Sequence, residues 1–212
     1  MPVANRMKLI AWAEKGNRLI IEDDYDSELR YTGRPISSLQ GLCPQGTIIY
    51  QGTFSKVFSP ALRLSYMVLP RELTDAYRQK FRNYLSPAPL LLQRTMVAFM
   101  ERGYWEQHLR RARIFYKKKH DLMLRSIEQS FGNTAKAVGQ GAGLHIVLEL
   151  TDSVKSEAKL IERAKHHGCR LLPCSDFYAD GKTENNKLLL GFGGISAESI
   201  PQGIELLSKL TA

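Results

Sequence analysis

The sequence has few cysteines and lacks a long hydrophobic run. Its 212 residues include three cysteines, and none of them forms a Cys-x-x-Cys pair. This set excludes a disulfide-dense secreted domain and favours reduced thiols in a cytoplasmic protein. Apolar runs such as 88–92, which Pro89 interrupts, are too short to cross a bilayer, and the first residues show no secretory signal pattern. We therefore expect a chain without a membrane-spanning segment.

The composition is otherwise ordinary for a globular protein. Hydrophobic residues make up 43% of the chain and charged residues 24%, which excludes disordered and collagen-like chains. A chain of this length can bury roughly 70% of the surface that its unfolded form exposes. The sequence can therefore form a sizeable core, in one large domain or two small ones.

Acidic residues are outnumbered, and the net charge is +9. Residues 102–125 hold eight lysines and arginines but only two acidic residues. Such a surplus raises the hypothesis of nucleic-acid contact. However, Trp105, Leu109 and Ala112 recur at helical spacing, and neither a nucleic-acid recognition motif nor a set of metal ligands accompanies the charge. We favour a solvated helix face, and we expect no metal site.

Apolar periodicity divides the chain into strands and helices. Short apolar runs at 18–22, 47–50 and 64–69 predict three strands of a mostly parallel sheet. Helical spacing predicts helices over 5–15, 71–83, 90–102 and 104–131. After a glycine-rich turn at 139–143, the pattern predicts strands at 144–150, 170–173 and 187–192, and helices at 154–167 and 197–210.

This alternation predicts an α/β protein with two lobes. We expect a partial large domain over residues 1–103, a long connecting helix over 104–133 and a small C-terminal α/β domain over 134–212. Since a buried parallel strand needs neighbours on both sides, three strands would make the large domain incomplete.

Polar residues follow two of the expected strands. Asp23 and Tyr25 come directly after the run at 18–22, and the hydroxyl-rich segment 53–56 follows the run at 47–50. Open α/β sheets bind ligands at the carboxyl ends of their strands. A carboxylate such as Asp23 would keep a pyridine nitrogen protonated, and a phenol such as Tyr25 would bond to a ring oxygen.

The second segment suits a phosphorylated aldehyde. The amine of Lys56 can condense with a carbonyl group, while the hydroxyls of Thr53 and Ser55 and the guanidinium of Arg63 can bind a phosphate. Each residue taken singly would favour a surface role. Their joint occurrence at two strand ends, with a spacing of 33 residues from Asp23 to Lys56, favours a binding site.

These two segments carry a resemblance to a known family. Glu-Asp-Asp-Tyr-Asp-Ser-Glu-Leu-Arg-Tyr (22–31) and Gly-Thr-Phe-Ser-Lys-Val-Phe-Ser-Pro-Ala-Leu-Arg (52–63) resemble the cofactor region of fold-type-I aminotransferases. More narrowly, they resemble the aminotransferase-like domain of the MocR/GabR transcription regulators of the GntR family. The likeness runs through essentially all 212 residues and includes Gly-Ala-Gly-Leu-His (141–145).

The resemblance implies pyridoxal 5'-phosphate (PLP) as the cofactor and a role for each candidate residue. Lys56 would form a Schiff base with PLP, Asp23 would pair with the pyridine nitrogen, and Tyr25 would bond to the ring hydroxyl. The phosphate would lie among the three remaining candidates, Thr53, Ser55 and Arg63. The resemblance also implies a homodimer and a small amine or amino acid as the effector.

The sequence departs from the family in two ways. It resembles only the C-terminal part of such a regulator, so DNA contact would belong to an N-terminal winged-helix domain that this chain lacks. The family also often places an arginine for a substrate carboxylate after the last strand, where this chain has Gly194. His145 and Tyr178 lie on segments that the family brings near the site, and they are weaker candidates for effector contacts.

Three interpretations follow from these observations. The leading one is an effector-sensing, PLP-binding part of a MocR/GabR-type regulator. The alternative is an aminotransferase acting on an amino acid or amine, in which Lys56 would also act as the general base. A third is a chain that binds no cofactor because half of the site's walls are missing.

Overall fold

The structure is a computed structural model that describes residues 1–33, 37–43, 47–139, 141–151, 157–179 and 186–211. It divides into two compact units. Unit 1 consists of Met1–Ser27 and Gly33–Arg110, and unit 2 of Glu28–Thr32 and Arg111–Ala212. Each unit is described by itself below.

Unit 1 is built on a three-stranded sheet. Its strands lie in the order β1 (Ile20–Asp24), β2 (Ile48–Thr53) and β3 (Ser65–Val68). β1 pairs with β2 in parallel, while β2 pairs with β3 antiparallel. The predicted α/β class and the three strands are confirmed, but the sheet is mixed, because the short connection through 54–64 returns β3 alongside β2 in the opposite direction.

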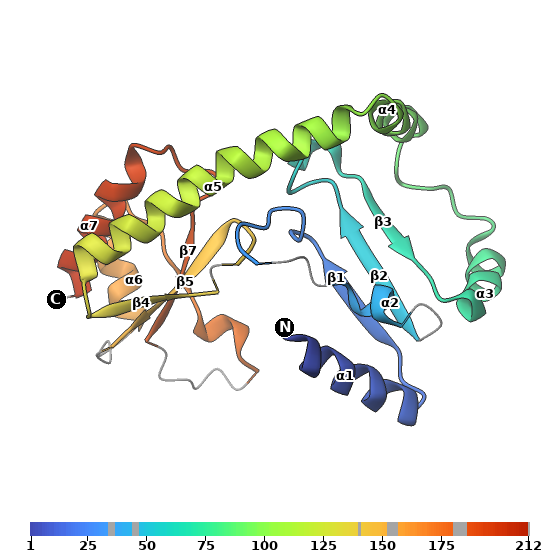
Figure 1. Ribbon diagram of the computed structural model, residues 1–212, viewed down its shortest axis with the longest axis horizontal. Coiled ribbons are helices and arrows are strands. Elements are labelled where there is room, and N and C mark those ends of the chain that lie inside the picture. The colour runs from blue at the N-terminus through green and yellow to red at the C-terminus, as the bar shows by residue number, and fades with distance from the viewer. Residues whose placement is uncertain (34–36, 44–46, 140, 152–156, 180–185, 212) are drawn as a thin grey trace. The chain divides into compact units, whose positions relative to one another are not determined.

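Helices cover one face of this sheet. Ile10 of α1 (Val3–Lys15), Leu39 of α2 (Leu39–Leu42) and Ile48 of β2 form its buried core. Figure 1 shows both helices beside β1 and β2. Strand residues alternate between faces, so the opposite face carries Ile21 and Met67, whose side chains are 63% and 42% exposed. The sheet thus has one packed face and one open face.

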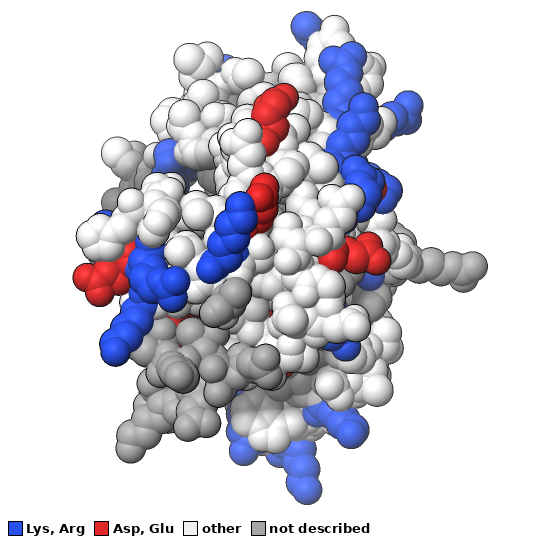
Figure 2. All heavy atoms as spheres, turned by 90° about the vertical axis from the view of Figure 1, so that its left-hand side faces the viewer, with Lys and Arg blue, Asp and Glu red and all other residues white. Residues whose placement is uncertain are grey.

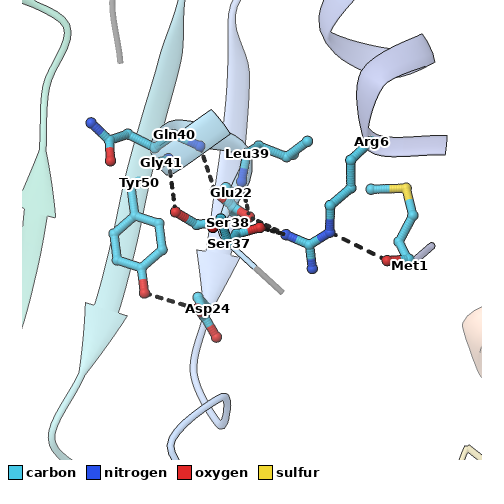
Figure 3. Close-up of polar contacts among 10 residues, drawn as sticks. All are labelled: Met1, Arg6, Glu22, Asp24, Ser37, Ser38, Leu39, Gln40, Gly41 and Tyr50. Carbon is cyan, nitrogen blue, oxygen red and sulfur yellow. Dashed lines mark hydrogen bonds and ion pairs between the residues drawn. The ribbon is translucent and has the colours of Figure 1, made fainter. Parts of the chain in front are cut away.

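Figure 3 shows the contacts of Glu22, a charged residue on the packed face of the sheet. The Glu22 carboxylate of β1 accepts hydrogen bonds from the backbone N–H groups of Leu39 (2.8 Å) and Gln40 (3.1 Å) at the start of α2. It also pairs with the Arg6 guanidinium of α1 at 3.4 Å, and both side chains are less than one-fifth exposed. Arg6 donates a further bond to the Ser37 carbonyl at 2.8 Å. Glu22 therefore joins α1, β1 and α2.

Unit 1 contains further helices. The 3₁₀ helix η1 (Pro60–Leu62) lies between β2 and β3, and the sheet is followed by α3 (Arg71–Phe81), α4 (Leu90–Glu101) and the first part of α5 (Tyr104–Phe131). Gly103 separates α4 from α5 with a φ of 71°, a conformation that suits glycine. The segment after α3 exposes apolar side chains, with Tyr84 at 73% and Leu85 at 96%. Exposed apolar clusters of this kind are typical of surfaces that another protein segment covers.

Unit 2 is an antiparallel sheet packed against helices. Its strands lie in the order β4 (Ala135–Val138), β5 (His145–Leu150), β7 (Lys187–Gly191) and β6 (Leu172–Pro173). Its helices are the rest of α5, α6 (Glu157–His166), η2 (Ser175–Phe177) and α7 (Ser199–Thr211). Alternate residues of β5, such as Ile146 and Leu148, are fully buried against the helices. The expected strands and helices of this region are present where the structure describes the chain, and β4 is an additional strand; the first three residues of the helix expected over 154–167 lie outside the described residues.

Five residues that follow β1 belong to unit 2. Leu29 is fully buried, and its carbonyl accepts a hydrogen bond from the N–H of Gly143 at 2.9 Å. The Tyr31 hydroxyl donates to the Gly143 carbonyl at 2.8 Å, and its ring lies 4.7 Å from that of His120. Residues 28–32 therefore pack within unit 2, although the residues before and after them in the sequence belong to unit 1.

The basic stretch lies mainly on α5. Its lysines and arginines are exposed, as expected for a solvated face, except Lys119, which is 9% exposed and donates to the carbonyls of Gly193 and Ile195 at 3.2 and 2.5 Å. On the face drawn in Figure 2, most Lys and Arg side chains lie toward the margin, and one lies near the centre beside an acidic side chain. In the described part of the chain, no helix combines the length and hydropathy needed to cross a membrane, and no three metal-ligating side chains cluster.

We predict that Glu22→Gln lowers the free energy of unfolding of unit 1 by about 1–3 kcal/mol, because the neutral amide leaves Arg6 and the start of α2 without their carboxylate. Urea unfolding followed by tryptophan fluorescence measures this, since both tryptophans, Trp12 and Trp105, lie in unit 1. Glu101→Gln, at the exposed end of α4, is the control. Equal stability of the two variants would contradict the role of Glu22.

Candidate functional site

The candidate site begins with the parallel pairing of β1 and β2. Asp23 lies opposite Gln51 in this register, and Thr53 follows two residues further along β2. Because side chains alternate along a strand, Asp23, Gln51 and Thr53 belong to the same face of the sheet, which is the open face. The structure thus brings the Asp23 carboxylate and the Thr53 hydroxyl to the same edge of the sheet, where β1 and β2 end.

Lys56 lies on the loop that follows β2. Its side chain is exposed, and its Nζ lies 5.6 Å from the centre of the Tyr25 ring. This contact joins the two sequence segments that predict the site. An ammonium group at this distance from an aromatic ring is attracted to the ring face.

The Lys56 loop is held by its neighbours. Val57 is buried, and its carbonyl lies 2.7 Å from Nε2 of His108 in the first part of α5. The Phe58 ring packs edge-on against Phe99 at 5.2 Å, and its backbone N–H donates to the Phe54 carbonyl at 2.9 Å. The residues beside Lys56 are therefore fixed, while its own amine is accessible.

The predicted phosphate residues lie in the same unit. The Thr53 hydroxyl lies 3.3 Å from the Leu64 carbonyl and accepts a bond from the N–H of Ser55 at 3.2 Å, so it also shapes the loop. Arg63 ends η1 with a φ of 48°, a conformation that is uncommon for residues other than glycine. Among the described residues, the side chains of Ser55 and Arg63 make no hydrogen bond or ion pair. Both can donate to a ligand.

The electrostatics keep the phenol of Tyr25 protonated. Burial raises the pKa of Tyr25, and the nearby carboxylates of Asp26 and then Asp23 raise it further. Burial and negative neighbours both disfavour a phenolate anion. Tyr25 can therefore donate a hydrogen bond at neutral pH.

Sequence reasoning missed two residues beneath the site. The Tyr50 hydroxyl of β2 donates to Oδ2 of Asp24 at 2.8 Å (Figure 3). Burial and this carboxylate together raise the pKa of Tyr50 far above its ordinary value. Strand alternation was the available signal, because it places Asp24 and Tyr50 on the face opposite Asp23.

The weaker candidates lie in unit 2. His145 is the first residue of β5, half-buried and opposite Gly191, and Tyr178 follows η2 with a 42% exposed side chain. A side chain added at Gly194 would meet no atom within 4 Å. The structure places all six predicted cofactor residues in unit 1, and effector contacts by His145 and Tyr178 stay predictions.

The chain is similar to transcription regulators over almost its whole length. No protein-family model matches the chain. It is 42% identical over 212 residues to the uncharacterised HTH-type transcriptional regulator YhdI of Bacillus subtilis, covering all of this chain and 45% of that protein. It is 31% identical over 207 residues to the probable rhizopine catabolism regulatory protein MocR of Rhizobium meliloti, covering 98% of this chain and 42% of the relative.

A solved structure gives the same answer for the fold. The kynurenine aminotransferase of Pyrococcus horikoshii, in complex with PMP, matches with a TM-score of 0.89 at 29% identity, covering all of this chain and 52% of that one. Over almost its whole length the chain is therefore similar to one part of these transcription regulators and to aminotransferases. Its fold is that of fold type I, as the sequence resemblance predicts. This aminotransferase-like chain spans a little under half the length of the MocR-type relatives that it matches.

We predict that Asp26→Asn lowers the pKa of Tyr25, because it removes one of the two negative charges that oppose phenolate formation. The pKa stays above the ordinary value, since burial is the larger cause. A pH titration by NMR with ¹³C-labelled tyrosine, assigned with Tyr25→Phe, measures it. Asp75→Asn on the exposed part of α3 is the control. A pKa that does not move, or that moves equally in the control, would rule out this electrostatic coupling.

Proposed function

We propose that this chain binds PLP covalently through Lys56 and, as the aminotransferase-like part of a MocR-type regulator, senses a small amine or amino acid. The observation that carries the proposal is the grouping of Lys56, Tyr25 and Asp23 at one sheet edge of a chain with MocR-type relatives. The aminotransferase neighbours support PLP as the cofactor.

The residues present fit PLP. Lys56 offers an accessible amine to the aldehyde, Asp23 an exposed carboxylate to the ring nitrogen, and Tyr25 a protonated phenol to the ring hydroxyl. Ser55 and Arg63 offer hydrogen-bond donors to the phosphate, and a guanidinium binds phosphate through two parallel bonds. When bound, PLP supplies an aldehyde and a ring that withdraws electrons.

Two of the chain's own residues would hold the cofactor. Lys56 would hold the cofactor through its side-chain amine, which is exposed on the loop after β2. Asp23 would keep a proton on the ring nitrogen, because a carboxylate stabilises an adjacent positive charge. An amine effector would displace Lys56 and thereby free its side chain.

The proposal extends to partners. Contact with DNA would be made by a helix-turn-helix part of the whole protein, as the names of the relatives suggest. The exposed apolar segment after α3, including Leu85, supports assembly as a homodimer. We also infer a cytoplasmic location, where a transcription regulator of bacterial type acts.

A second candidate function is amino-group transfer. The match to the kynurenine aminotransferase favours it. In that function Lys56 would also move a proton from the α-carbon of the substrate, acting as the general base. A sensor needs only the exchange of amines on the cofactor, without a second substrate.

We predict that the complete native polypeptide containing this chain gains a visible absorption band with PLP, that borohydride abolishes the band, and that Lys56→Ala never shows it. Lys80→Ala on the exposed part of α3 is the matched control and should behave as wild type. Mass spectrometry of the reduced protein confirms the adduct. A band that persists in Lys56→Ala would refute the assignment.

Turnover separates the two functions. If the protein is a sensor, an amino acid or amine changes the band while keto-acid product stays below one equivalent of protein. Continued keto-acid formation in the presence of a second keto acid would favour the transferase.

A further inference from the structure

A hydrogen bond on the packed face of the sheet lies directly beneath the candidate site. We propose that Asp24 and Tyr50 form a positioning pair, which fixes the end of β1 so that Asp23 and Tyr25 meet the cofactor. The inference rests on the proposed function. Neither member of the pair touches PLP in this account, and both act through their neighbours in the chain.

The position of Asp24 makes it suited to this role. It lies between Asp23 and Tyr25 in the sequence, and strand alternation turns it to the opposite face. The backbone pairing of β1 with β2 ends at Asp24, which lies opposite Gly52. β1 is an edge strand of the described sheet, so β2 is its one strand neighbour there. The bond from the Asp24 side chain to Tyr50 of β2 therefore fixes β1 at the residue where its backbone pairing ends.

The bond itself is well defined. The hydroxyl of Tyr50 donates to Oδ2 of Asp24 at 2.8 Å, and both groups are partly buried. Hydrogen bonds to a carboxylate are stronger than bonds between neutral groups, and partial burial protects them from water. Because Tyr50 comes from β2, this bond ties the Asp23 strand to the strand that leads to Lys56.

Tyr50 is held in turn by aromatic packing. Its ring centre lies 6.2 Å from that of Tyr66 on β3, which lies 5.6 Å from that of Phe54. Tyr66 covers Gly52 so closely that a Cβ there would lie 2.5 Å from the Tyr66 ring. Phe54 is the residue after β2 and packs edge-on against Trp105 of α5 at 5.4 Å. The same cluster thus supports both the Asp24 bond and the start of the Lys56 loop.

The test removes one hydroxyl. In the complete native polypeptide, Tyr50→Phe should raise the dissociation constant of PLP about tenfold, as expected for losing a bond to a charged group. It should also shift the absorption maximum of the lysine-bound cofactor, because Asp23 would no longer hold the ring nitrogen correctly. Tyr77→Phe on α3 is the matched control, since its side chain is 43% exposed and its hydroxyl makes no hydrogen bond among the described residues.

A conservative variant separates positioning from general stability. Asp24→Asn keeps an oxygen that can accept the Tyr50 hydroxyl, so it should lose less PLP affinity than Asp24→Ala. In the Asp24→Ala background, Tyr50→Phe should have no further effect. A merely structural role would lower the unfolding midpoint and leave the absorption maximum of the bound cofactor unchanged.

Each outcome decides the proposal. If wild type binds PLP and Tyr50→Phe matches it in affinity and absorption maximum, the positioning pair is wrong and the proposed function stands. If wild type shows no lysine-bound band with PLP, both fall together.

Discussion

The parallel pairing of β1 with β2 is the constraint on which the candidate site depends. It is this pairing that carries Asp23 and Thr53 to the same edge and face, and the loop after β2 then brings Lys56 to the Tyr25 ring. An antiparallel pair would send the two segments to opposite edges. Two carboxylates on the packed face stabilise the β1–β2 pairing. Glu22 accepts a hydrogen bond from the start of α2, and Asp24 accepts one from the Tyr50 hydroxyl.

The two faces of this small sheet have different roles: one packs against helices, and the other carries candidate site residues. On the packed face, buried aliphatic side chains and the Glu22 contacts hold α1 and α2. On the open face, the groups that suit PLP are exposed, together with apolar residues such as Ile21. Because Asp23 stands on the strand pair and Lys56 on a loop held by packed neighbours, their spacing is set by the backbone before any ligand binds.

The sequence placed the two candidate segments better than the contacts that support them. Polar residues after apolar runs were enough to place Asp23 and Lys56 after neighbouring strands, since strand ends are local features. The antiparallel direction of β3 and the strand β4 were not predicted, because pairing partners are set by tertiary contacts. The same holds for Leu29 and for the buried Lys119, whose partners Gly143 and Gly193 lie over 70 residues away in the chain.

The central claim is that one PLP molecule contacts both Asp23 near the end of β1 and Lys56 after the end of β2. A crystal structure of the complete native polypeptide with PLP tests this most directly. The account predicts a covalent bond from Nζ of Lys56 to the former aldehyde carbon, with the Asp23 carboxylate hydrogen-bonded to the ring nitrogen of the same molecule. A cofactor bound to another lysine, or a ring nitrogen that faces away from Asp23, would contradict it.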